Sequence, residues 1–289
     1  MGLIYNRETK EVYEDFQYGG KGLDFLYHTA FGRVILKLLV SRTVSRIYGA
    51  YMSTGFSKRH IEGFVAKNHI DMARYEDRDF ASFKDFFTRK LKELKMDDEP
   101  DRFVAPADSK LLVYPIDKDL KIQVKKSFYT VGDMLGRDSG EVAQEYKNGT
   151  CLVFRLAVDD YHRYHFSDDG TVIDTQTIDG CLHTISSFAD DYKVFSRNYR
   201  VCNYLDMVHM GRIAMIEVGA MLVGRIVNHD CREFKKGQEK GYFEPGGSTI
   251  ILLVGSNVKI DEDILENSRK LVETKVHCLE SIGYIRNKV

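Results

Sequence analysis

The sequence has little of what marks linkers, secreted scaffolds and metal sites. It contains four prolines and no long glycine- or serine-rich tract, so we expect neither a flexible linker nor a low-complexity segment. Its five cysteines are scattered, odd in number and never spaced as C-x-x-C, which argues against a zinc site and against a disulfide framework. Free cysteines of this kind are typical of a reducing compartment.

The chain also lacks an excess of charge and a long apolar run. A formal net charge of -1 gives no reason to expect nucleic acid as a partner. No uncharged apolar segment approaches the length that spans a bilayer, and the first residues are too polar for a secretory signal. With 289 residues, 43% of them hydrophobic, the chain has enough apolar content for a globular fold with a sizeable core.

Helical periodicity is present between residues 20 and 95. From Leu23 to Leu39, apolar side chains recur at intervals of three and four and form one continuous stripe. Such a helix can lie in a membrane interface or pack on the rest of the protein, and the pattern alone leaves both open. Further helices are expected over 57–68 and over 80–94, the latter with Ser82 as N-cap. Basic side chains punctuate the stripe: Arg33, Lys37, Arg42 and Arg46.

Beyond Pro100 the pattern changes to short, β-branched, apolar runs that glycine or charged turns separate. Because no long helical patterns alternate with these runs, a doubly wound parallel sheet is not expected. We predict an α+β fold, with a helical region over 1–99 that fronts a mostly antiparallel, sandwich- or barrel-like β domain over 100–289. The expected strands are 104–113, 121–124, 151–157, 170–178, 213–218, 221–227 and 248–254.

One chemically suggestive segment precedes the last of these strands. Ser248 follows Gly246 and Gly247, whose lack of a Cβ opens backbone conformations that other residues avoid. A serine that attacks the carbonyl of the preceding residue converts an amide into an ester, which can then break. The segment therefore predicts either self-cleavage between Gly247 and Ser248 or an ordinary turn that leads into a strand.

A second segment, Asp160-Tyr-His162-Arg-Tyr-His165, is dense in titratable side chains. Histidine can donate or accept a proton near neutral pH, as a general acid or base must. A metal site is less favoured, because the HEXXH spacing is absent and no third ligand suggests itself. A purely structural pair of hydrogen-bonded histidines stays open on the residues alone.

A third segment places Asp108 in Ala105-Pro-Ala-Asp108, just ahead of a strand. Alone, this aspartate has the position of an ordinary turn residue. Together with a histidine and Ser248, it completes the set of an orienting acid, a base and a nucleophile. Geometry and not chain order defines such a triad, so the order Asp, His, Ser is no obstacle.

Taken together, ordered blocks over most of the chain resemble the phosphatidylserine decarboxylase family, a family of self-processing, pyruvoyl-dependent lyases. Each block is similar to a family element at the corresponding place in the chain. The blocks are Ser82–Lys92 (SFxxFFxRxLK), Ala105–Asp108 (the PAD element), Asp160–His165 (DYHRxH), Phe195–Arg200 (FxxNxR), Val218–Gly224 (VGAxxVG) and Lys236–Thr249, the processing region.

The resemblance implies a mechanism and its residues. His165, oriented by Asp108, would deprotonate Ser248, which would attack the carbonyl of Gly247. Cleavage would give a β chain of residues 1–247 and an α chain of residues 248–289 that begins with a covalent pyruvoyl group made from Ser248. This cofactor would form a Schiff base with phosphatidylserine, release carbon dioxide and yield phosphatidylethanolamine, with His162 as proton donor.

The resemblance also implies where the protein works and with what. The expected partners are phosphatidylserine in anionic membranes and the two chains of one precursor, and a homodimer is allowed. The expected place is the cytoplasmic face of a bacterial-type cell membrane, as a peripheral protein that residues 20–56 attach. Rival functions are a pyruvoyl-dependent decarboxylase of a soluble amino acid, a lipid-binding paralogue that never processes, and a metal-dependent hydrolase.

Overall fold

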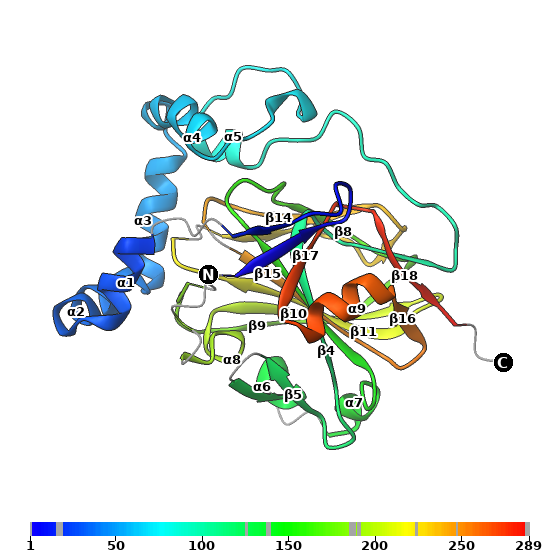
Figure 1. The fold of residues 1–289 in the computed structure, drawn as a ribbon. Coiled ribbons are helices and arrows are strands. Elements are labelled where there is room, and N and C mark those ends of the chain that lie inside the picture. The colour runs from blue at the N-terminus through cyan, green and yellow to red at the C-terminus, as the bar shows by residue number, and fades with distance from the viewer. Residues whose placement is uncertain are drawn as a thin grey trace.

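A large, mostly antiparallel sheet forms the centre of the computed structural model (Figure 1). The structure describes residues 2–15, 20–124, 127–136, 140–184, 189, 192–222, 225–246 and 248–286. All the paired strands of this sheet run antiparallel except β1 and β17, which are parallel. In spatial order its ten strands are β13 (Glu233–Phe234), β9 (Gly170–Ile178), β10 (Arg200–Met207), β11 (Gly211–Gly219), β15 (Ser248–Val254), β7 (Thr150–Leu156), β4 (Ser109–Pro115), β17 (Val272–Val276), β1 (Leu3–Asn6) and β2 (Val12–Glu14).

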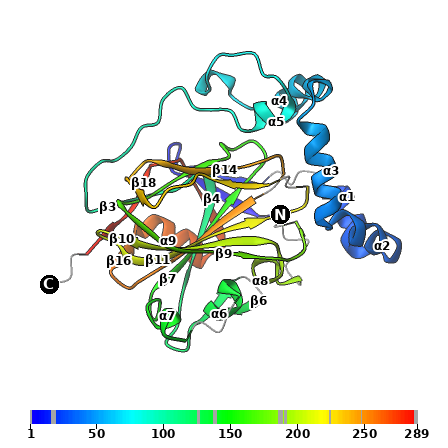
Figure 2. The same cartoon turned by 180° about the vertical axis from the view of Figure 1, so that it is seen from behind.

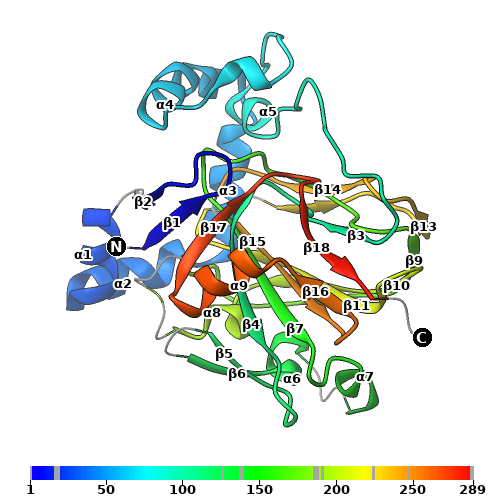
Figure 3. The same ribbon diagram turned by 45° about the vertical axis from the view of Figure 1, so that its right-hand side comes forward.

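Smaller sheets lie beside the large one and make the β region sandwich-like. The sheet that concerns the site has the order β12 (Ile226–Asn228), β14 (Glu239–Phe243) and β8 (Arg163–His165). A further three-stranded sheet has the order β16 (Val258–Ile260), β18 (Ser281–Ile285) and β3 (Arg102–Val104), and β5 (Lys121–Val124) pairs with β6 (Ser127–Thr130). Figure 3 shows β16 and β18 with α9 on the side where β17 and β4 lie.

The N-terminal helices stand to one side of the β region, and α4 and α5 lie above it in the view of Figure 1; the view from behind shows the same arrangement (Figure 2). Elsewhere, short helices connect strands. The helices are α1 (Gly20–His28), α2 (Ala30–Leu39), α3 (Arg42–Met52), α4 (Ile61–Lys67), α5 (Phe83–Phe87), α6 (Val131–Leu135), α7 (Gly140–Gln144), α8 (Val194–Arg197) and α9 (Glu262–Arg269), with the 3-10 turns η1 (Gly55–His60) and η2 (Met72–Arg74).

The predicted fold class is confirmed, since N-terminal helices accompany a mostly antiparallel, sandwich-like core. The expected stripe from Leu23 to Leu39 is divided between two helices, α1 and α2, because Thr29 caps a new helix; Ser41 then caps α3 beyond the stripe. Residues 1–99 are not helical throughout, as β1 and β2 belong to the large sheet. The boundary between two domains at residue 99 stays a prediction.

Several element boundaries differ from the expected ones. The hydroxyl of Ser82 caps α5 as predicted, but the helix ends at Phe87 and not near residue 94. The run 104–113 is two strands, β3 and β4, which the turn around Asp108 separates. The strand expected over 221–227 is not present as such: β12 begins only at Ile226. Residues 223 and 224 of this range lie outside the described part. The strand expected over 248–254 is present with those bounds.

Apolar side chains cover both faces of the large sheet. Ile250 and Leu252 of β15 belong to a core shared with Tyr164 of β8 and Phe243 of β14. Their neighbours on the same strand, such as Ile251, belong to a separate core on the opposite face. Because side chains alternate along a strand, Ser248 shares the face of Ile250 and Leu252. The small sheet that carries His165 covers that face.

Candidate active site

Buried ion pairs and hydrogen bonds hold the turn that precedes His162. The ammonium of Lys110 lies 2.7 Å from both carboxylate oxygens of Asp160, and the Ala157 amide donates to the same carboxylate over 2.7 Å. The guanidinium of Arg89, only 1% exposed, donates to the carbonyl of Asp159 over 3.1 Å. These contacts fix the backbone from which His162 projects.

The His162 ring is fully buried and held at one nitrogen only. Its Nδ1 lies 2.9 Å from the carbonyl oxygen of Asp160, which can only accept, so Nδ1 carries the proton. Its Nε2 has no hydrogen-bond partner among the described residues. The Phe87 ring of α5 lies against it, with 4.0 Å between ring centroids. Burial lowers the pKa of His162 to about 3, so the ring is neutral at pH 7 and Nε2 presents a lone pair.

The second histidine, His165, lies at the end of β8 and is 2% exposed. Its backbone amide donates to the carbonyl of Pro106 over 2.8 Å, and its ring stacks on Tyr161. Its Nδ1 lies 3.2 Å from the thiol sulfur of Cys278. Burial lowers the pKa of His165 to about 4, which leaves the ring neutral and able to accept a proton at pH 7.

Asp108 lies in the turn between β3 and β4 and is 3% exposed. Its carboxylate accepts from the Cys278 amide over 2.8 Å and from the Arg74 guanidinium over 3.1 Å, and His277 Nδ1 lies 3.8 Å away. Burial raises the pKa of Asp108, but His277, Arg74 and the Cys278 amide outweigh it, so the pKa lies below its usual value. The group is therefore an anion at neutral pH.

Ser248 begins β15 and is fully buried, and its hydroxyl has no hydrogen-bond partner among the described residues. An unpaired buried hydroxyl costs about 1–3 kcal/mol, and such groups are rare enough to need an explanation. Gly246, two residues earlier, has φ 142°, a conformation that other residues rarely adopt. Gly247, the other side of the expected cleavage site, lies outside the described residues.

The structure brings Asp108 and His165 together around one residue, Cys278. The Cys278 amide binds the aspartate and its thiol contacts the histidine. Within the described ranges, no direct hydrogen bond joins Asp108 to His165, or His165 to Ser248. Ser248 and His162 each present a buried polar atom without a partner. The catalytic roles of these four residues stay predictions.

Comparisons with known proteins bear on what this arrangement is for. The family model described as phosphatidylserine decarboxylase matches residues 83–284. The chain is 49% identical over 285 residues to phosphatidylserine decarboxylase proenzyme 2 of Clostridium acetobutylicum, covering 97% of each chain. The chain belongs to the phosphatidylserine decarboxylase family. It is also 39% identical to the phosphatidylserine decarboxylase proenzyme of Fusobacterium nucleatum over 292 residues, again with 97% of each chain covered.

This member of the phosphatidylserine decarboxylase family contains site residues that the sequence analysis missed. Arg74, His277 and Cys278 surround Asp108, yet they lie far from it and from the histidine motif in the sequence. The pairing of β17 with β4, which sets Val276 opposite Ser109, brings two of them there. No local pattern in the sequence marks these residues, and nothing in the sequence assigned Cys278 a role beyond that of a small buried side chain.

The described residues around Ser248 fit the covalent pyruvoyl group that the family resemblance implies. The hydroxyl from which the group would form is buried and unpaired, and Gly246 holds the preceding backbone in an unusual conformation. In and next to the small sheet that covers the same face, His165 and His162 are both neutral at pH 7 and able to accept protons. The donor set is therefore suited to serine chemistry away from bulk water.

Acid is expected to destabilise the uncleaved chain through its two buried histidines. The pKa values of about 3 for His162 and about 4 for His165 lie below the ordinary 6.5. Between about pH 4 and 6.5 the unfolded chain binds two protons that the folded chain does not, so stability falls as the pH falls. Each histidine contributes a slope of about 1.4 kcal/mol per pH unit.

Urea unfolding of the uncleaved Ser248→Ala protein across this range measures the slope. Adding His162→Gln or His165→Gln should reduce the pH slope of the free energy of unfolding by the contribution of one proton, about 1.4 kcal/mol per pH unit. The double substitution should reduce the slope by the contribution of two protons. An unchanged slope in the double variant would show that the folded chain already binds these protons.

Proposed function

We propose that the chain is the proenzyme of a phosphatidylserine decarboxylase and makes its cofactor from Ser248. The observation that carries the proposal is the fully buried, unpaired hydroxyl of Ser248 directly after the glycine pair. Relatives named as phosphatidylserine decarboxylase proenzymes align with 97% of the chain. The rival of a paralogue that never processes lacks support, since Asp108, His165 and Ser248 are all present.

In the first reaction Ser248 Oγ attacks the carbonyl carbon of Gly247. The new C–O bond replaces the peptide C–N bond, and the hydroxyl proton passes through His165 to the departing amine. Removal of the Cα proton of residue 248 then breaks the Cβ–O bond. This elimination releases the carboxyl end of the chain 1–247 and leaves dehydroalanine, whose hydrolysis yields ammonia and a pyruvoyl group on the chain 248–289.

Asp108 assists this reaction as a buried anion. Its low pKa keeps it charged, and its field favours the imidazolium that forms when His165 accepts a proton. In the uncleaved chain, the Cys278 thiol contacts His165 Nδ1 and the Cys278 amide holds Asp108. Cys278 is therefore a positioning residue that links acid and base.

The pyruvoyl carbonyl supplies an electron sink for decarboxylation when it binds the substrate amine. Loss of carbon dioxide then requires that one proton be added to the substrate's α-carbon. His162 is suited to relay it: its Nδ1 is anchored on the Asp160 carbonyl, and the lone pair of its Nε2, which has no partner among the described residues, can accept a proton that the substrate ammonium loses and return it to the α-carbon. The Phe87 ring that covers His162 keeps water from this transfer.

Carbon dioxide release from two substrates tests the activity. The purified protein should release it from phosphatidylserine in detergent micelles and not from free serine, with no effect of a chelator. Carbon dioxide release from serine alone would favour a decarboxylase of a soluble amino acid. Loss of activity when a chelator is added would favour the metal-dependent hydrolase. A chain that stays whole and inactive in the presence of anionic lipid would contradict the proposal.

We further propose that α1–α3 attach the enzyme peripherally to the cytoplasmic face of the membrane. Within the described part of the chain, no helix is long and apolar enough to cross a bilayer. On α2, Leu36 is buried, whereas Phe31, Val34 and Leu38 are 68%, 60% and 66% exposed. These three residues lie at helical spacing beside the exposed Arg33, which suits an interface with anionic lipids. The homodimer stays a prediction.

Replacing this exposed face is expected to weaken membrane binding. The triple variant Phe31→Ser, Val34→Ser, Leu38→Ser removes apolar area worth about 1.5–3 kcal/mol per fully inserted side chain. We expect at least about a tenfold loss of co-sedimentation with vesicles of phosphatidylserine and phosphatidylcholine. Substitution is preferable to deletion of residues 1–56, because β1 belongs to the large sheet.

The matched control replaces two exposed apolar residues far from the helices, Ile173→Ser and Val208→Ser, which are 52% and 67% exposed. This control should sediment like the wild type. Equal recovery of the triple variant and the control would remove the membrane role of α2.

A further inference from the structure

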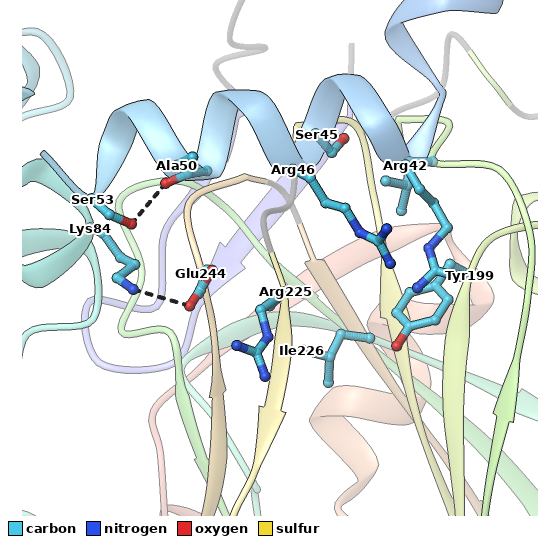
Figure 4. Close-up of a pocket in the computed structure, with 12 residues that line it drawn as sticks. Arg42, Ser45, Arg46, Ala50, Ser53, Lys84, Tyr199, Arg225, Ile226 and Glu244 are labelled. Carbon is cyan, nitrogen blue, oxygen red and sulfur yellow. Dashed lines mark hydrogen bonds and ion pairs between the residues drawn. The ribbon is translucent and has the colours of Figure 1, made fainter.

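A cavity of about 600 Å³ lies between α3 and the small sheet that carries the histidine motif. Figure 4 shows it, with α3 along one side and the strand of Arg225 and Ile226 on the other. Its volume is ample for a small polar ligand. Its wall comprises Arg42, Ser45, Arg46, Gly49, Ala50, Ser53, Lys84, Leu182, Tyr199, Arg225, Ile226 and Glu244.

The cavity is cationic, and two of its cations are available to a ligand. Arg42 pairs with Asp179 and lies over the Tyr199 ring, and Lys84 is 3.4 Å from Glu244. Arg46 and Arg225, both exposed, form no ion pair with any described residue. Figure 4 shows Arg46 extending from α3 toward the side of the cavity that carries Arg225. Two guanidinium groups without counter-charges in the described part of the chain suit a ligand with two anionic groups.

A buried hydroxyl in the same wall also lacks a partner. Ser45 is 1% exposed, and its Oγ makes no hydrogen bond with the described residues. It precedes Arg46 on α3, so hydroxyl and guanidinium lie one residue apart along the cavity wall. Because a buried unpaired hydroxyl is costly, a ligand oxygen that accepts from it would stabilise both.

The cavity adjoins the strand end where Ser248 lies. The carbonyl of Tyr199 accepts from the Gly219 amide over 2.9 Å, and Gly219 is the register partner of Ser248. On the other wall, the Glu244 amide donates to the Arg225 carbonyl over 2.9 Å, four residues before Ser248. A ligand in the cavity would therefore lie beside the proposed reacting residue.

We infer that this cavity binds the serine-phosphate head group of the lipid, with Arg225 on the carboxylate and Ser45 with Arg46 on the phosphate. The inference rests on the proposed function and deepens it. Arg225, joined to the segment that leads to Ser248, lies nearer the reacting amine and hence the carboxylate on the same carbon. Arg46 belongs to α3, which follows the exposed apolar face of α2, and so lies nearer the phosphate that joins head group to acyl chains.

Binding to the uncleaved Ser248→Ala protein tests this without any turnover. Calorimetry would compare glycerophosphoserine with glycerophosphoethanolamine, which lacks the carboxylate, and with inorganic phosphate. We expect glycerophosphoserine to bind most tightly. Arg225→Gln should weaken glycerophosphoserine about tenfold or more and leave glycerophosphoethanolamine unchanged, whereas Arg46→Gln should weaken both, since each variant loses a charge-assisted hydrogen bond to the group that its arginine binds. Ser45→Ala should also weaken both, by a smaller factor.

Arg232→Gln is the matched control, because Arg232 is exposed and does not line the cavity; it should bind all three compounds like the parent. Identical affinities in the Arg225, Arg46 and Arg232 variants would overturn the inference. So would inorganic phosphate that binds as tightly as glycerophosphoserine, which would mark a general anion site. Failure of the proposed function would look different. The wild-type chain would then release no carbon dioxide from phosphatidylserine, while the binding affinities of the Ser248→Ala protein would still be as expected.

Discussion

Ser248→Ala is expected to leave the chain whole and without decarboxylase activity. The variant lacks the oxygen that attacks the preceding carbonyl and the Cβ–O bond whose cleavage separates the two chains. Intact-mass measurement should show one chain for the variant. The wild type should show fragments 1–247 and 248–289, the second lighter than a serine start by the exchange of an amine for a ketone. Loss of activity should be complete, because no other residue can generate the pyruvoyl group.

Thr249→Val is the matched control for this result. Thr249 is also fully buried, and its hydroxyl also lacks a partner among the described residues. By strand alternation, however, it faces the opposite side of the sheet from Ser248. Cleavage should therefore persist in Thr249→Val. A Ser248→Ala chain that still divides at this bond, or a wild type that never does, would remove Ser248 as the nucleophile.

The two histidines are expected to separate cleavage from decarboxylation. His165→Asn should slow self-cleavage by about a hundredfold or more, the usual contribution of a general base, because the Ser248 proton then lacks an acceptor. His162→Asn should allow cleavage and pyruvoyl formation, but reduce carbon dioxide release by a similar factor. Time courses of fragment formation, followed by turnover assays on whatever fraction is cleaved, measure both effects.

Each histidine variant is the control for the other, since both rings are buried and close in the sequence. A His162→Asn protein that stays whole would assign both histidines to cleavage. A His165→Asn protein that cleaves at the wild-type rate would show that another group accepts the proton, and His277, whose Nδ1 lies 3.8 Å from Asp108, would be the candidate to substitute next.

Local sequence signals predicted the elements whose cause is local. Strand β15 has its predicted bounds, because an uninterrupted apolar run follows a glycine turn. The Ser82 cap was predicted for the same reason, since a hydroxyl at that position bonds to the amide of Asp85. The end of α5 was not, because the backbone beyond Phe87 is held by contacts with distant residues. Arg89 binds the carbonyl of Asp159, and the Thr88 carbonyl accepts from Arg163.

The chemistry-bearing residues of the candidate site were likewise visible in the sequence only where they form compact motifs. Asp108, His162, His165 and Ser248 each belong to such a motif. Arg74, His277 and Cys278 do not, and their proximity to Asp108 results from strand register. The cationic cavity joins α3 to a strand more than 170 residues later in the chain, which periodicity cannot reveal.

The sequence by itself determined the fold class, the compact motifs whose residues we propose cleave the chain, and an apolar helical stripe with basic flanks. Those depend on the identity and spacing of neighbours, which set local conformation and chemistry. Only the tertiary structure decided that Phe31 and Leu38 face outward while Leu36 is buried. It also decided that Cys278 lies between Asp108 and His165, and that Arg46 and Arg225 border one cavity. Such contacts depend on how distant segments pack and which charges they leave unpaired.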